Sequence, residues 1–304
     1  SMTSYSGVIP PVVSPMLTPD QLDGPAVSRI VEHLISGGVS GLFVLGTTGE
    51  GPSLTARMRH EMVELTCKAV AGRVPVFVCV TDTCLAESIA LTEHASRCGA
   101  AAVVAAAPFY FDVAQAALGA WFDALATASP LPLMLYNMPS CVGVVLGHEI
   151  VETLSHHPNI IGIKDSGGDM VYFEALCKRY RQREDFVIFI GPEERLADAV
   201  ALGAAGGVCG GANLLPHLYV AFYEAAARGD NAAAAKCADQ IRGVFESVYC
   251  DTEDKMNMIP GLKRAMHELG LCSAVVAPPL SSVTEGHAAK ISSVLPQLVA
   301  SSRL

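Results

Sequence analysis

Eight short apolar runs recur along the chain and restrict the folds that it can adopt. Each run is a continuous stretch of hydrophobic residues rather than a strict alternation of polar and apolar positions. Continuous runs are typical of strands that are buried on both faces, as in a parallel sheet. The pattern predicts strands at Gly7–Val13, Gly41–Leu45, Val76–Val80, Ala102–Ala106, Leu133–Tyr136, Ile160–Lys164, Phe186–Ile190 and Gly206–Cys209.

Segments with helical periodicity separate these runs, so strands and helices alternate along most of the chain. Eight strand–helix units predict an α/β fold, a closed (β/α)8 TIM barrel, over residues 1–228. A doubly wound open sheet is the alternative, but the count of eight and a second glycine-rich turn favour closure. The expected helices are Gly24–Ile35, Leu54–Val70, Leu85–Arg97, Val113–Ala126, His148–Leu154, Met170–Arg179, Arg195–Leu202 and Pro216–Ala227.

Residues 229–304 contain further helix-like segments. Because no low-complexity linker precedes them, we expect a C-terminal helical subdomain attached to the barrel rather than an independent domain. Its predicted helices are Asn231–Tyr249, Pro260–Leu269 and Glu285–Ala300.

The charge balance limits the partners that the protein can have. The chain of 304 residues has a formal net charge of −10, and it has no Lys/Arg-rich run that could neutralise phosphates. We therefore expect neither nucleic acid nor an anionic membrane surface as a partner. A small anionic substrate is compatible with this balance, because one lysine and a few N–H groups can hold a carboxylate.

The sequence also carries signals about location. No Lys or Arg precedes Arg29, whereas a secretory signal begins with basic residues and a transit peptide contains repeated arginines. The apolar stretches are far shorter than the roughly 20 residues that span a bilayer. The ten cysteines are scattered without CxxC spacing, as is typical of reduced thiols that serve as small hydrophobic residues. These features predict a cytoplasmic protein without a membrane partner.

Lys164 is the first candidate catalytic residue. In a TIM barrel the active site forms at the carboxyl ends of the strands, and of the seven lysines in the chain only Lys164 ends a predicted buried strand. Burial disfavours the ammonium form, so we expect a lowered pKa and a neutral amine that can attack a carbonyl. The alternative is a structural lysine that reaches solvent at the barrel mouth or pairs with Asp165.

Two other strand ends are informative. Tyr136 closes the strand before the one that carries Lys164, so its phenol could relay protons to a bound imine; a core tyrosine bonded to backbone is the alternative. The loop Gly46–Gly51 follows another strand, and its glycines, N–H groups and two threonine hydroxyls could cradle a carboxylate. Its spacing differs from that of a P-loop or a dinucleotide motif. An ordinary turn that caps the next helix is the alternative.

A cluster of aromatic residues, Pro108–Phe111, follows a further strand. It could form the barrel rim, part of the site or a contact between subunits, and the residues themselves favour the contact surface.

Taken together, these features resemble the dihydrodipicolinate synthase and N-acetylneuraminate lyase superfamily of pyruvate-handling class I aldolases. The matching stretches are GTTGE at 46–50, PFYF at 108–111, YNMPSCVG at 136–143, GIKDSGGD at 162–169 and GGVCGGAN at 206–213. They occur in the order of the family and span nearly the whole chain. Each motif is weak alone, but the combination is specific.

The resemblance implies a role for each matching position. Lys164 would form the Schiff base, and Tyr136 would relay protons to and from it. Thr47 would couple Tyr136 to a second tyrosine, Tyr110, which in family tetramers reaches into the site of a neighbour. Thr48 and the N–H groups of the loop that begins at Gly46 would hold the pyruvate carboxylate.

Two more implications follow from the family. The backbone carbonyl of Val208 would face the lysine and the substrate. Neither a metal nor an organic cofactor would be needed, because the iminium itself accepts electrons. We expect a homo-oligomer, a tetramer or a dimer, that acts on a small 2-oxo acid.

The sequence departs from the synthase branch at Cys141. In that branch an arginine here holds the carboxylate of the semialdehyde acceptor, and a thiol lacks the bidentate donor geometry of arginine. We therefore expect Cys141 to be a residue of the pocket wall. Acids follow Gly191 and Pro192, and in the sialic acid lyase branch acids near this point bind substrate hydroxyls. Glu194 is thus a candidate substrate ligand, although an acidic first turn that favours the helix dipole is the preferred interpretation.

The leading hypothesis is a Schiff-base lyase or aldolase that cleaves or condenses a 2-oxo acid, with pyruvate or glyoxylate as product or donor. The stretches at 157–169, 201–215 and 259–266 resemble the 4-hydroxy-2-oxoglutarate and 2-oxo-3-deoxy-sugar-acid aldolase branches. Dihydrodipicolinate synthase and a sugar-acid dehydratase are alternative enzyme functions. A non-catalytic binding or regulatory protein on the same barrel is the alternative from another class.

Overall fold

The computed structural model describes residues 4–303, and its central feature is a sheet of eight parallel strands. In the order β1-β10-β9-β8-β7-β6-β5-β4, each strand from β4 to β10 lies beside its neighbour in the chain, and β1 lies beside β10. The strands are β1 (Gly7–Val8), β4 (Leu42–Val44), β5 (Val76–Cys79), β6 (Ala102–Ala106), β7 (Leu133–Asn137), β8 (Ile160–Asp165), β9 (Val187–Ile190) and β10 (Gly206–Gly207).

The sheet closes on itself between its two edges, where the segment that follows β1 meets β4. A parallel bridge joins Pro11 to Phe43, and the N–H of Phe43 donates to the carbonyl of Pro10 at 3.0 Å. Closure makes the sheet a (β/α)8 barrel, as predicted from the eight apolar runs. The first strand is shorter than predicted, because the prolines after Val8 carry no N–H and cannot extend a regular ladder.

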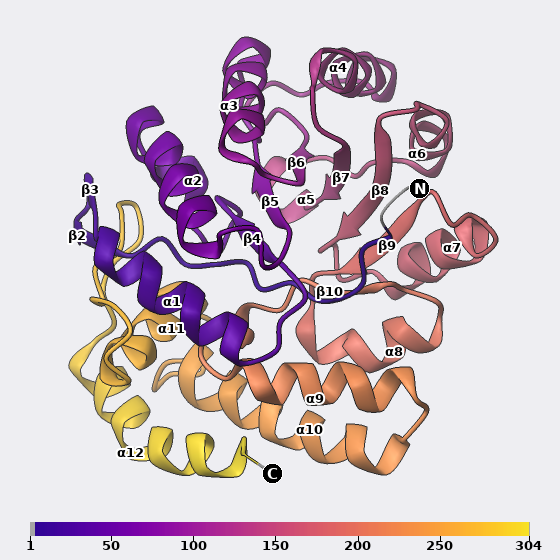
Figure 1. Cartoon of the computed structure of the whole chain (residues 1–304). Coiled ribbons are helices and arrows are strands. Elements are labelled where there is room, and N and C mark those ends of the chain that lie inside the picture. The colour runs from indigo at the N-terminus through magenta and orange to yellow at the C-terminus, as the bar shows by residue number, and fades with distance from the viewer. Residues whose placement is uncertain (1–3, 304) are drawn as a thin grey trace.

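Helices surround the barrel (Figure 1). Their amphipathic faces pack against the strands; on the first of them Ala26, Val27, Ile30, Val31 and Leu34 are buried. Asp23, Thr55 and Asp169 cap three of the helices through side-chain oxygens. The barrel helices are α1 (Gly24–Ser36), α2 (Ala56–Val70), α3 (Leu85–Cys98), α4 (Gln115–Ala128), the short α5 (Pro139–Val142), α6 (His148–Ser155), α7 (Met170–Tyr180), α8 (Leu196–Ala201) and α9 (Pro216–Ala227).

The C-terminal residues form helices that pack together beside α9, in orange and yellow in Figure 1. They are α10 (Asn231–Val244), the π-helical turn η4 (Phe245–Tyr249), α11 (Met258–Glu268) and α12 (Glu285–Ser301). The segment predicted as one helix over 231–249 therefore changes to π-helical geometry at Phe245. The boundary between a barrel domain and this extension stays a prediction.

A small hairpin was missed by the sequence analysis. Strands β2 (Met16–Thr18) and β3 (Gln21–Leu22) pair antiparallel outside the barrel. They are too short, and too mixed in polarity, to give a period that could be recognised in the sequence.

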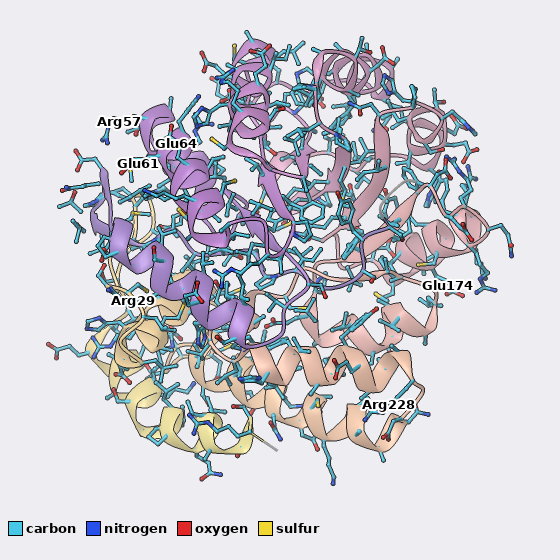
Figure 2. The ribbon with its side chains drawn as sticks, viewed as in Figure 1. Arg29, Arg57, Glu61, Glu64, Glu174 and Arg228 are labelled. Atoms are coloured by element: carbon cyan, nitrogen blue, oxygen red, sulfur yellow. The ribbon has the colours of Figure 1, made fainter. Side chains whose placement is uncertain are left out.

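Charged side chains lie on the outside of the barrel. Figure 2 shows Arg57, Glu61 and Glu64 at the edge of the molecule beside α2, and Arg57 and Glu61 approach to 3.7 Å. Such exposed pairs contribute little to stability. All ten cysteines are free thiols. Among residues 4–303, no helix combines the length and the apolar character needed to cross a membrane.

One ion pair is fully buried and joins the C-terminal extension to the barrel. Lys263 on α11 donates to Glu50 (Nζ–Oε2 2.6 Å) and to the carbonyl of Val275 (2.7 Å), while the N–H of Ala277 donates to Glu50 Oε1 (2.8 Å). Both charged side chains have no exposed surface. Burial lowers the pKa of Lys263, and the attraction of Glu50 opposes this effect.

Removing Lys263 is expected to destabilise the fold strongly. Lys263→Met leaves the Glu50 carboxylate buried without its charge partner, which should lower the free energy of unfolding by about 3–5 kcal/mol. Urea unfolding would measure the loss. Arg264→Met, which breaks a partly exposed pair with Glu268, is the control and should cost under about 1 kcal/mol. A loss that small for Lys263→Met would contradict the prediction.

Candidate active site

Lys164 and Tyr136 lie side by side at the carboxyl ends of adjacent strands. They are register partners on β8 and β7, and each side chain is 4% exposed. Lys164 Nζ lies 4.3 Å from the centre of the Tyr136 ring and 4.6 Å from that of Phe43. The two rings are nearly perpendicular, at 81°, so the nitrogen lies in the corner that they form.

The acid that follows Lys164 is engaged elsewhere. Asp165 Oδ1 accepts hydrogen bonds from the Asn137 side chain at 2.9 Å and from the N–H of Gly167 at 3.0 Å. Burial raises the pKa of Asp165, against the effect of these two bonds. No ion pair of Lys164 occurs within the described part of the chain, so neither structural alternative, a pair with Asp165 or a lysine in open solvent, describes Lys164.

The glycine-rich loop after β4 presents a hydroxyl to Tyr136. Thr47 Oγ1 lies 3.1 Å from the Tyr136 hydroxyl, and Thr48 is buried beside it. The tight turn depends on Gly51, where a Cβ would lie 2.1 Å from the carbonyl oxygen of Leu45. The Ser14 hydroxyl donates to the carbonyl of Gly49 at 2.7 Å and fixes the other side of the loop.

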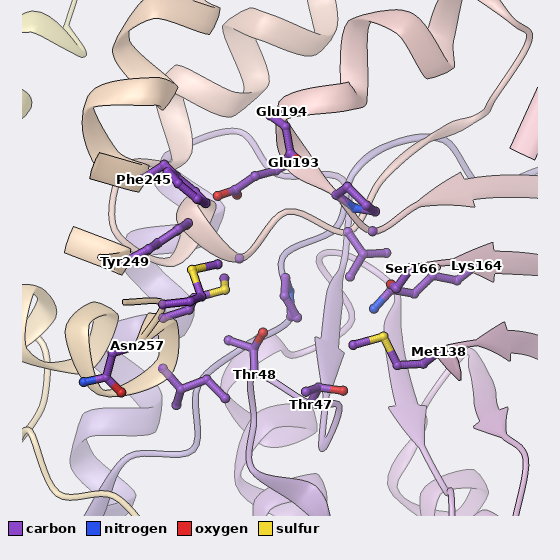
Figure 3. Close-up of a pocket in the computed structure, with 18 of the residues that line it drawn as sticks. Thr47, Thr48, Met138, Lys164, Ser166, Glu193, Glu194, Phe245, Tyr249 and Asn257 are labelled. Carbon is purple, nitrogen blue, oxygen red and sulfur yellow. The ribbon is translucent and has the colours of Figure 1, made fainter. Parts of the chain in front are cut away.

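A cavity of about 470 Å³ opens over these residues. Figure 3 shows Lys164, Ser166 and Met138 at one side of it, Phe245, Tyr249 and Asn257 at the opposite side, and Thr47 and Thr48 between them. The predicted site residues that line it are Thr47, Thr48, Tyr136, Lys164, Gly191, Glu194 and Val208.

Glu193 is a wall residue whose role the sequence did not reveal. It belongs with Glu194 to the first turn of the 3-10 helix η2 (Glu193–Arg195), as an acidic first turn predicts. Unlike a solvated turn residue it is buried, and its carboxylate accepts the N–H of Gly211 at 2.8 Å. Burial raises the pKa of Glu193 to about 7. The buried hydroxyls of Tyr219 and Tyr249 lie against Gly211 and interact with the Glu193 carboxylate, which opposes the rise in the pKa of Glu193.

The far wall of the cavity was also missed. It comes from η4 and from the segment that leads into α11, and it includes Phe245, Met256 and Met258. These residues follow no strand of the barrel, so the rule that locates TIM-barrel sites at strand ends does not find them.

Two predicted residues lie in a second, smaller cavity. Gly46 and Cys141 line a space of about 270 Å³ that shares Thr47, Tyr136 and Met138 with the first cavity. The structure therefore places Cys141 in the wall of the cavity that adjoins the Lys164 cavity, with Tyr136 bordering both.

Tyr110 is not brought to this site within one chain. Its side chain is 88% exposed and stacks edge-on with Phe111, and its backbone is in the left-handed region at φ 101°. Such backbone is costly for a residue with a side chain and is often found at functional positions.

Residues 4–303 contain no group of three or more His, Cys, Asp or Glu side chains that could hold a metal ion. The chemical groups at the site are a buried amine, a phenol, hydroxyls and backbone N–H groups.

Comparison with known proteins shows the family. A family model described as the dihydrodipicolinate synthetase family matches residues 4–298. A dihydrodipicolinate synthase from Bacteroides thetaiotaomicron superposes with a TM-score of 0.93 at 40% identity, covering 97% of this chain and 100% of the other.

Two proteins of Escherichia coli K12 are also similar. YagE, a prophage protein whose structure was solved in complex with pyruvate, matches with a TM-score of 0.89 at 31% identity over 97% of this chain and 98% of its own. YjhH, named "Probable 2-dehydro-3-deoxy-D-pentonate aldolase", is 35% identical over 77% of this chain and 78% of its own. Synthases and aldolases thus have similar sequence identity to this chain. The chain belongs to the dihydrodipicolinate synthetase family and is a class I, Schiff-base carbon–carbon lyase or aldolase.

Proposed function

We propose that Lys164 forms a Schiff base with a 2-oxo acid, and that the enzyme cleaves or forms the bond between C3 and C4 of that acid with pyruvate as product or donor. One observation carries the proposal: a buried amine lies against the rings of Phe43 and Tyr136, and the Tyr136 hydroxyl is paired with Thr47. The pyruvate complex of YagE, a relative of the same fold, supports the choice of ligand.

The reaction in the cleavage direction begins at the lysine. The Lys164 amine adds to C2, and loss of water leaves an iminium. A base removes the proton of the C4 hydroxyl, the C3–C4 bond breaks, and its electrons form the enamine while the aldehyde leaves. Protonation of C3 and hydrolysis then release pyruvate and the free amine. The iminium accepts the electrons, so this sequence requires no further electron sink.

Tyr136 is the proposed proton relay for these steps. Its hydroxyl is on the strand next to Lys164 and shares a hydrogen bond with Thr47, so the proton can pass along this pair. Thr48 and the N–H groups of the loop that begins at Gly46 would hold the substrate carboxylate. Val208 would face the imine through its carbonyl, and Gly191 and Glu194 would border the substrate beyond it.

The chemistry of the walls bears on the choice between synthase and aldolase. Cys141 lies in the second cavity. Its thiol cannot make the two parallel charged hydrogen bonds by which an arginine binds an acceptor carboxylate. We therefore propose aldol cleavage or addition, as in 4-hydroxy-2-oxoglutarate or 2-oxo-3-deoxy-sugar-acid aldolases, with glyoxylate as the other fragment in the first case. Dihydrodipicolinate synthesis and dehydration of a sugar acid are the alternatives that start from the same imine.

We also propose a homo-oligomer, a tetramer or a dimer, in which Tyr110 completes the site of a neighbouring subunit. The proposal is supported by the exposed phenol on costly backbone, and by the cavity that stays open beside Thr47 within one chain. A cytoplasmic location stays a prediction.

Trapping with borohydride tests the Schiff base. With pyruvate, the parent protein should gain a stable adduct that peptide mass spectrometry places on Lys164, and Lys164→Ala should give none. Lys178→Ala removes an exposed lysine on α7 that pairs with Glu174, and as the control it should trap pyruvate like the parent. No adduct on the parent at saturating pyruvate would refute the proposed function.

Tyr136→Phe separates imine formation from proton transfer. This variant should still trap pyruvate, but its kcat should fall roughly 10²- to 10⁴-fold because the relay is lost. Tyr180→Phe, which removes a hydroxyl bonded to Glu152 on the outside of the barrel, is the matched control and should turn over normally. Equal turnover of Tyr136→Phe and the parent would remove this phenol from the mechanism.

Complementation tests the contribution of Tyr110 to a neighbour. The mass of the parent protein in solution should be that of a dimer or tetramer. Tyr110→Phe should slow turnover and leave this mass unchanged. Co-expressed Tyr110→Phe and Lys164→Ala chains should recover activity, because some mixed sites combine an intact lysine with an intact tyrosine. A monomeric mass, or no recovery in mixed oligomers, would contradict the prediction.

A further inference from the structure

The cavity has two chemically different ends. At the Lys164 end lie the groups that suit a 2-oxo acid: the amine, two threonine hydroxyls and the loop of N–H groups. At the opposite end the wall is built by the C-terminal extension and is mostly apolar. Its members include Phe245, Tyr249, Met256, Met258, Ile259 and Leu280.

Two of these side chains are unusually exposed for their type. Phe245 is 42% exposed and Met256 is 59% exposed, and both border the cavity. Large apolar groups that stay open at the mouth of a site provide surface that a ligand can cover. Figure 3 shows Phe245 and Tyr249 grouped on the side opposite Lys164.

The rim that carries Met256 is a built structure. Met256 pairs with Cys250 across an isolated antiparallel bridge, and the N–H of Asn257 donates to the carbonyl of Tyr249 at 2.6 Å. Lys290 on α12 donates to the carbonyls of Cys250 and Asp251 and so fixes the turn between Cys250 and Met256. The backbone of Met256 at the edge of the cavity is therefore fixed by hydrogen bonds.

The charges around the cavity are unbalanced. Of the described residues that line it, Lys164 is the one cation, and in the iminium its charge stays at C2, beside the first carboxylate of the substrate; Glu193 and Glu194 are the acids. The lysines of the adjoining segments are engaged: Lys263 bonds Glu50, Lys290 bonds carbonyls, and the exposed Lys255 pairs with Glu253. A second carboxylate on the substrate would therefore meet acids without a compensating cation.

From these walls we infer that the substrate carries, beyond C4, an uncharged group with an apolar face, such as an aryl ring, which packs against Phe245 and Met256. This inference rests on the proposed function: it keeps the Schiff-base aldol reaction and replaces the glyoxylate or polyol fragment of the aldolases named above by an apolar one. The aldehyde fragment is uncharged and apolar, so a dicarboxylic substrate such as 4-hydroxy-2-oxoglutarate is disfavoured. Specificity is then set by the C-terminal extension, while the barrel supplies the reacting groups.

An aldehyde panel tests the inference in the addition direction. Pyruvate is paired with benzaldehyde, succinate semialdehyde or D-glyceraldehyde, and product formation is followed by mass-resolved chromatography. The parent enzyme should show a kcat/KM for benzaldehyde at least about tenfold above those for the other two, in the range expected of contacts in an apolar pocket. A preference for the anionic aldehyde, or for the polyol, would overturn the inference.

A charge placed at the rim gives the complementary test. Met256→Arg should raise kcat/KM for succinate semialdehyde about tenfold and lower that for benzaldehyde. Leu17→Arg adds the same charge at a side chain of similar exposure, 53%, on β2, outside the residues that line the cavity; it should leave the order of the aldehydes unchanged. The same shift in both variants would mean that overall charge, and not the rim, sets the preference, and would overturn the inference.

Pyruvate trapping keeps the two proposals distinguishable. If the parent forms no borohydride-stable adduct, the proposed function itself fails. If it forms the adduct and uses the carboxylated aldehyde as well as benzaldehyde, the proposed function stands and the inference about the apolar group falls.

Discussion

The buried ion pair between Glu50 and Lys263 is the interaction on which the site depends most. Glu50 lies in the left-handed region at φ 55° in the loop that also carries Thr47 and Thr48. Its carboxylate receives both the ammonium of α11 and the N–H of Ala277. An ion buried this deeply is tolerated only when its partners are in place. The C-terminal extension therefore holds in position the loop whose hydroxyl meets Tyr136.

The site thus has two parts with different origins. The reacting amine and phenol come from neighbouring parallel strands, whose register fixes their separation. The opposite wall comes from a π-helical turn and a hydrogen-bonded rim in the extension. The strands supply the reacting groups, and the wall from the extension contacts the rest of the substrate. This division is common in barrel enzymes, where variation lies outside the strands.

The parts of the structure that follow from local pattern could be predicted. Continuous apolar runs gave the eight strands, and a lysine ending such a run pointed to Lys164, because both signals lie within a few residues of sequence. Contacts between distant segments could not be predicted in this way. Glu193 reads as an ordinary acidic turn until the fold buries it against Gly211, and Cys141 is placed only when the cavities are seen. Met256 lies in a polar stretch without a motif, so its place at the mouth depends on tertiary structure.

Phe43 connects closure of the barrel to the reactivity of its lysine. This residue pairs with Pro11 where the sheet meets itself, and its ring forms one of the two aromatic faces around Lys164 Nζ. Phe43 also pairs with Phe77 on β5, so its ring is positioned by the segments on both sides of β4. The surroundings of the nucleophile on β8 therefore depend on residues near the amino terminus, and a substitution there can change the reactivity of Lys164 from a distance in the sequence.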